Sequence, residues 1–75
     1  MILPTKHLSP RRSLLGVGGL VLERLDQPRT ITALWERAKR VPEVGSLDRF
    51  ILALDFLYAL GVIEFDAGLL RRASR

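Results

Sequence analysis

Apolar residues recur at helical spacing in the first third of the chain. The apolar and small positions lie three or four residues apart on one helical face: Leu14, Val17, Gly18, Val21, Leu22 and Leu25. Ser9 and Pro10 are the residue types favoured at an N-cap and at the first helical position. The pattern therefore predicts a helix that begins at Ser9–Pro10 and ends near Asp26, because Pro28 cannot continue it.

A second apolar stripe predicts a helix that Thr30 or Thr32 caps and Pro42 ends. Its apolar positions are Ile31, Leu34, Trp35, Ala38 and Val41. We expect Trp35, which lies on this stripe, to be a core residue.

The last third of the chain predicts a helix followed by a hairpin. Ser46 is a suitable N-cap for a helix over Leu47–Leu60, and Gly61 suits the position after its C-cap. The β-branched and aromatic run Val62–Phe65, a turn at residues 66–68 and Leu69–Arg72 then predict two short strands.

These elements predict a mainly α fold with a C-terminal β-hairpin. We expect an extended N-terminal arm over residues 1–8 and one small winged-helix domain, a helix-turn-helix variant, over residues 9–75. Because a lone two-stranded hairpin is not stable, we expect it to pack on the helices. The alternative is a plain three-helix bundle with a disordered tail.

Composition favours a binding module over an enzyme. The chain has 75 residues, 12 Lys and Arg against 8 Asp and Glu, a net charge of +4, no Cys and one His. Without Cys, disulfide scaffolds, zinc ribbons and thiol catalysis are excluded. His7 has no second His beside it in the sequence, so we expect no catalytic residue, no metal and no cofactor. The absence of a signal peptide or a membrane-spanning run predicts a soluble, cytoplasmic protein.

The predicted third helix is poorly suited to DNA. Its charged residues are Asp48, Arg49 and Asp55, and the wheel places Leu52 and Phe56 between the two carboxylates. Such a face repels phosphate, and a helix that is apolar nearly all round needs cover on more than one side. We therefore expect Leu52 and Phe56 to contact a protein partner. The alternatives are that the arm or hairpin covers them, or that they are ordinary exposed apolar residues.

Two further segments are candidate partner contacts. Ile2 and Leu3 give the arm an apolar end. The cluster Gly16, Gly18 and Gly19 has no phosphate-loop context, because no strand precedes it and no Lys-Ser or Lys-Thr follows. We expect it to allow close helix packing on the side of Gly16 and Gly19, where Leu15 and Leu20 could receive a partner's helix.

Basic residues near both ends are candidates for phosphate contact: Lys6, Arg11, Arg12, Arg71, Arg72 and Arg75. Point charges are sufficient for non-specific binding to nucleic acid. The alternative is a solvated surface, and no aromatic residues are interleaved with these charges for base stacking.

Four segments together resemble the sixth family of middle components of bacterial ABC-type three-component systems. They are Ile2–Ser9, Arg12–Gly18, Thr32–Trp35 and Asp48–Gly61. The resemblance implies a small adaptor beside an SMC- or Rad50-like ABC ATPase and an effector, often a nuclease, in anti-phage or anti-plasmid defence similar to Lamassu systems. It transfers no catalytic residue.

The sequence thus supports two hypotheses of function. The first is a non-catalytic adaptor, part of a hetero-oligomer with an ATPase and an effector from the same operon, with auxiliary non-specific DNA contact. The second is a winged-helix transcription regulator, which requires a basic third helix that this sequence lacks.

Overall fold

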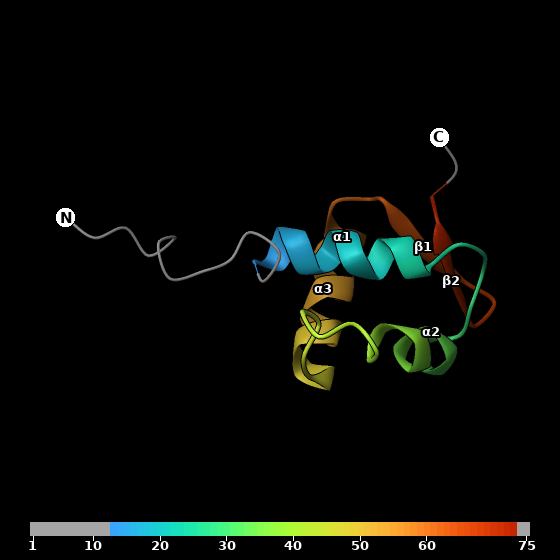
Figure 1. The fold of residues 1–75 in the computed structure, drawn as a ribbon. Coiled ribbons are helices and arrows are strands. Elements are labelled where there is room, and N and C mark those ends of the chain that lie inside the picture. The colour runs from blue at the N-terminus through green and yellow to red at the C-terminus, as the bar shows by residue number, and fades with distance from the viewer. Residues whose placement is uncertain (1–12, 74–75) are drawn as a thin grey trace.

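The computed structural model of the chain describes residues 13–73 and has three helices followed by two strands. The elements are α1 (Leu14–Arg24), α2 (Ile31–Ala38), α3 (Leu47–Ala59), β1 (Ile63–Asp66) and β2 (Leu69–Arg72). In Figure 1, α1 lies over α3, and the hairpin lies beside the C-terminal end of α1. The predicted mainly helical chain with a C-terminal hairpin is confirmed; the predicted arm at residues 1–8 lies outside the described residues.

The start of α1 differs from the prediction. Ser13 is the N-cap, with extended backbone (φ −68°, ψ 162°), and its hydroxyl accepts a hydrogen bond from the Gly16 N–H at 3.1 Å. A residue with this backbone cannot lie inside a helix, so the prediction that the helix begins at Ser9–Pro10 is wrong. Two serines four positions apart both precede the apolar stripe, and the capping bond formed by Ser13 decides between them.

The predicted ends of α3 are confirmed within one residue, whereas α2 ends at Ala38, before the predicted end at Pro42, so that Val41 lies beyond the helix. Thr30 and Ser46 cap α2 and α3, and each hydroxyl accepts from the backbone N–H three residues on. After α3, the N–H of Gly61 (φ +77°) donates to the Tyr58 carbonyl and that of Val62 donates to the Leu57 carbonyl. These bonds form a Schellman motif, which favours glycine at Gly61 and turns the chain from α3 into the hairpin.

The hairpin closes through a two-residue turn and is extended by one residue from the loop between α1 and α2. β1 pairs antiparallel with β2, with Phe65 opposite Leu70. Ala67 and Gly68 have φ of +53° and +80°, as in the type I′ turn of a tight hairpin. On the other side of β2, Arg29 exchanges two backbone hydrogen bonds with Leu70, at 2.9 and 2.7 Å. This bridge attaches the hairpin to the helical part of the chain.

All elements contribute to one apolar core. The buried residues are Val17, Val21, Leu25, Leu34, Ala38, Val41, Val44, Phe50, Ala53, Leu54, Leu57, Ile63 and Leu70. Phe50 is the largest side chain that is fully buried, and its ring centroid lies 5.2 Å from that of Trp35. Trp35 itself is partly buried and packs against the core, in agreement with its predicted place on the apolar stripe of α2.

A close approach of α1 and α3 occurs at Gly18, whereas the sequence suggested the side of Gly16 and Gly19. A Cβ at Gly18 would lie 3.3 Å from a methyl carbon of Leu57 and 3.6 Å from the Phe56 ring. A Cβ at Gly19 would have no neighbour within 4 Å. The predicted packing role is therefore wrong for Gly19 and belongs to Gly18, which the apolar stripe already contained.

Substitution by alanine should affect stability differently at Gly18 and at Gly19. Gly19→Ala should raise the free energy of unfolding by about 1 kcal/mol, because alanine favours helix and the new methyl group meets nothing. At Gly18 the same gain is offset because Leu57 must give way, so Gly18→Ala should be clearly less stable than Gly19→Ala. Urea unfolding of both variants measures the difference, and equal stabilities would contradict the close contact at Gly18.

Candidate functional site

The candidate partner residues that the structure describes lie on α1 and α3. Leu15 and Leu52 are 68% and 58% exposed, whereas Leu20 and Phe56 are partly buried. The Phe56 ring is covered in part by α1 at Gly18, because the missing side chain there lets the helices approach. The arm residues Ile2 and Leu3 lie outside the described residues, so their predicted partner contact stays a prediction.

Exposed apolar residues are more numerous than the sequence indicated. They are Leu14, Leu15, Ile31, Leu47, Ile51, Leu52, Tyr58, Leu60, Val62, Phe65 and Leu69. Scattered exposed apolar side chains are ordinary, but contiguous groups of them mark contact sites. Five of these residues belong to α3 or its C-cap, so α3 is the centre of the apolar surface.

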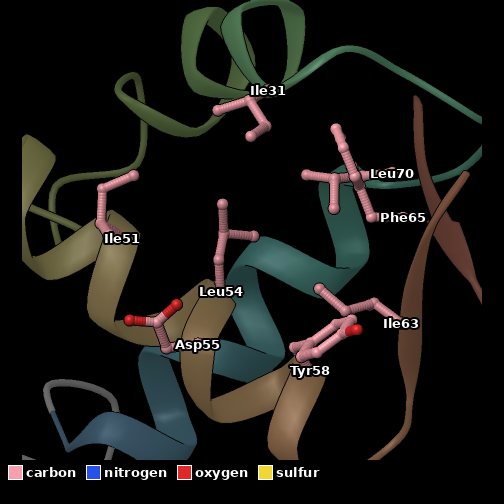
Figure 2. Close-up of a pocket in the computed structure, with 8 residues that line it drawn as sticks. All are labelled: Ile31, Ile51, Leu54, Asp55, Tyr58, Ile63, Phe65 and Leu70. Atoms are coloured by element: carbon pink, nitrogen blue, oxygen red, sulfur yellow. The ribbon is translucent and has the colours of Figure 1, made fainter. Parts of the chain in front are cut away.

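One contiguous group forms an open pocket of about 220 Å³ between α3 and the hairpin, which we name the α3–hairpin groove. Its lining residues are Ile31, Ile51, Leu54, Asp55, Tyr58, Ile63, Phe65 and Leu70. Figure 2 shows these side chains around one open space, with α3 on one side and the strands on the other. Sequence analysis missed this groove because its residues come from four separate segments. The available signal was Ile51 and Tyr58, seven positions apart on one face of α3.

The exposed face of α3 carries negative charge. Asp48 and Asp55 are exposed, and neither forms an ion pair with another residue of the described part of the chain. Arg49, the one cation of α3, turns toward the preceding segment, where its Nη1 lies 3.5 Å from the Glu43 carbonyl oxygen. The third helix therefore presents carboxylates and apolar side chains, a surface that repels phosphate and suits a protein.

The two described arginines among the predicted phosphate contacts have partners within the chain. Arg72 donates from Nε to the Leu25 carbonyl at 3.0 Å and from Nη2 to the Leu22 carbonyl at 2.8 Å. Arg71 forms ion pairs with Glu64 at 3.1 Å and Asp66 at 3.9 Å. Their phosphate contact stays a prediction. So does that of the other residues proposed for it, which lie outside the described range: Lys6, Arg11, Arg12 and Arg75.

A second basic cluster lies between the ends of α1 and α2, where Arg24 joins two residues of the basic group Arg37, Lys39 and Arg40 that the sequence already contains. Arg24, Arg37 and Arg40 line an open hollow of about 490 Å³ together with Glu36. Arg37 donates to the Arg24 carbonyl at 3.3 Å, so the two elements meet there. Nearby, the hydrogen bond from Arg29 holds the pKa of Asp26 below its ordinary value of 3.8.

Residues 13–73 contain no group of three or more His, Asp or Glu side chains placed to hold a metal ion. None of the helices in this part of the chain is long and apolar enough to cross a membrane. The predicted absence of metal and cofactor is not tested by a structure without ligands.

Comparison with known proteins gives a family. No curated protein and no solved structure matches the chain. The model of the family described as ABC-three component (ABC-3C) system Middle Component 6 matches residues 3–73, which is nearly the whole chain. The match agrees with the resemblance drawn from the four sequence segments. The chain therefore belongs to the Middle Component 6 family of ABC-three component systems.

Proposed function

We propose that this chain is a non-catalytic adaptor that joins an SMC- or Rad50-like ABC ATPase to an effector of the nuclease type in an anti-phage or anti-plasmid complex. The observation that carries the proposal is the family match over residues 3–73, which makes the chain the middle component of a multi-subunit system. A middle component that supplies contacts rather than chemistry fits a chain with no Cys and one His. The complex would work in the cytoplasm.

The fold supports assignment as a small winged helix. The order α1, α2, α3, β1, β2 agrees with that fold, and the bridge of Arg29 to Leu70 supplies the short third strand beside the hairpin. In a DNA-reading winged helix, the third helix needs polar or basic residues for phosphates and base edges. Here the exposed face of α3 carries Leu52, Asp48 and Asp55, which supports protein binding and argues against a sequence-specific regulator.

Auxiliary contact with DNA belongs to the same proposal. Positive charge outside α3 is supplied by the cluster of Arg24, Arg37 and Arg40 and by Arg71 and Arg72 of β2. Such charges bind phosphate without reading sequence. We propose that they steady DNA held by the complex rather than select a site.

Leu52→Glu should disrupt the complex while leaving the fold intact. The side chain is 58% exposed on α3, and glutamate has nearly the helix propensity of leucine. A new carboxylate in a desolvated contact should weaken binding by at least about tenfold. The measurement is co-purification of the tagged chain with the ATPase and effector of its own operon, followed by the affinity of each pair.

Leu69→Glu is the matched control, because Leu69 is also an exposed apolar residue but lies on the strand β2 rather than on α3. It should bind as the unchanged chain does. Equal binding of the Leu52→Glu variant would remove that residue from the contact. If the unchanged chain forms no complex with either neighbour, the adaptor function is refuted.

A further inference from the structure

The α3–hairpin groove has an apolar floor that no other residue in the range 13–73 covers. Leu54, Ile63 and Leu70 form buried parts of its lining, and the aromatic side chains of Tyr58 and Phe65 at its edge are 62% and 53% exposed. Figure 2 shows both at the edge of the opening, Tyr58 from α3 and Phe65 from the hairpin. Large aromatic side chains at the edge of an apolar pocket are typical anchors for a protein partner.

The charge of the groove selects the kind of partner. Asp55 is the one charged residue among the lining residues, and it has no ion-pair partner within residues 13–73. The cations of α3 and β2 are directed elsewhere. Arg49 lies toward the Glu43 carbonyl, Arg71 pairs with Glu64 and Asp66, and Arg72 donates to the C-terminal carbonyls of α1. A carboxylate beside an apolar pocket therefore remains available for an incoming cation.

We propose that the α3–hairpin groove binds an apolar segment of a partner protein that carries a lysine or arginine, with the cation paired to Asp55 and apolar side chains against Tyr58 and Phe65. This inference rests on the proposed function, because it takes the partner to be another component of the same system. It adds a second contact site, formed by residues other than Leu52 and Leu15.

The same charge disfavours two other occupants. Nucleic acid would bring phosphates against Asp55 with no cation in the lining to offset them. A second copy of this chain placed face to face on the groove would bring two Asp55 carboxylates into one interface, with no cation in either lining to pair with them. A partner segment with a cation avoids the repulsion between Asp55 and phosphate and the repulsion between two Asp55 carboxylates. Its apolar residues also bury the exposed side chains of Tyr58 and Phe65.

The test uses the whole chain and synthetic peptides that tile the sequences of the other two components, titrated by fluorescence polarisation. We expect peptides that combine large apolar residues with a lysine or arginine to bind. Tyr58→Ala should weaken this binding about thirtyfold, as the loss of an aromatic anchor does. Asp55→Lys should weaken it at least about tenfold, because it places like charges together.

Two matched variants control for general effects. Asp48→Lys makes the same charge reversal on α3 at an exposed residue that does not line the groove, and it should change the affinity by no more than about twofold. Leu60→Ala shortens an exposed apolar residue at the C-cap of α3, also outside the lining. Changing the cation of the bound peptide to glutamate should restore binding to the Asp55→Lys variant and abolish binding to the unchanged chain.

Each contrary outcome identifies what fails. Suppose that both components bind the unchanged chain, and that Tyr58→Ala and Asp55→Lys do not weaken binding to the components or to the peptides. The groove is then refuted as the binding site, and the adaptor function stands. If neither component and no peptide binds, both are refuted. If the unchanged chain forms a dimer that Tyr58→Ala dissolves, the occupant is a second copy. If duplex DNA binds, Asp55→Lys raises the affinity for DNA and no peptide binds, the occupant is nucleic acid. A second copy or nucleic acid as the occupant overturns the proposal.

Discussion

Phe50→Ala should remove a large part of the free energy of unfolding of the chain at 25 °C. The Phe50 side chain is fully buried in the core and lies against Trp35, with 5.2 Å between ring centroids. Truncation of a buried phenylalanine to alanine costs about 3–5 kcal/mol through lost burial and the cavity left behind. A chain of 75 residues has about 4–11 kcal/mol of stability in total, at roughly 0.05–0.15 kcal/mol per residue.

Circular dichroism and urea unfolding measure this effect, with Leu52→Ala as the control. Leu52 is on the same helix but more than half exposed, so its truncation should change the free energy of unfolding by less than about 0.5 kcal/mol. Equal losses in the two variants would contradict the core described here. A folded Phe50→Ala variant with a loss below about 1 kcal/mol would show that α2 and α3 do not depend on this contact.

The sequence predicts most of the fold because each element carries a local signal. Ser46 and Gly61 mark both ends of α3 through capping chemistry, which depends on neighbouring residues alone. The start of α1 had two local candidates, Ser9 and Ser13, and propensity alone favoured the one followed by proline. The bond from the Gly16 N–H to Ser13 separates them, and a sequence does not show which bond forms.

The candidate site was predicted less completely because it depends on packing between distant segments. Helical spacing placed Leu52 on an exposed face, but it could not show that Gly18 of α1 approaches α3 and covers part of Phe56. The α3–hairpin groove joins Ile31, Ile51 and Phe65, which lie up to 34 positions apart in the numbering. Periodicity describes one helix at a time and contains no information about such pairs.

Arg72→Met should lower the free energy of unfolding by about 1.5–3 kcal/mol, the value of hydrogen bonds from a charged donor. The guanidinium donates to the carbonyls of Leu25 and Leu22 at the C-terminal end of α1, where the Leu22 carbonyl also accepts from the Leu25 N–H. Carbonyls at a helix end lack the donor of a following helical turn, so a side-chain donor there is stabilising. These bonds fasten β2 to α1, so their loss also loosens the hairpin. Methionine keeps an apolar stem, and the midpoint of thermal unfolding should fall by roughly 6–24 °C for a domain of this size.

Arg71→Met is the neighbouring control, because the ion pairs of Arg71 with Glu64 and Asp66 are solvent-exposed and worth about 0–1 kcal/mol.

The Arg72→Met and Arg71→Met variants also test the predicted phosphate contact. A guanidinium has five N–H donors, and two of those of Arg72 are used within the chain, so the others remain for phosphate. If either arginine contacts DNA in the folded complex, its methionine variant should reduce the slope of log affinity against log salt by about 0.9. If Arg72→Met, measured below its unfolding temperature, leaves the slope of log affinity against log salt unchanged, the role of Arg72 is structural: it holds the hairpin on α1 and does not contact phosphate.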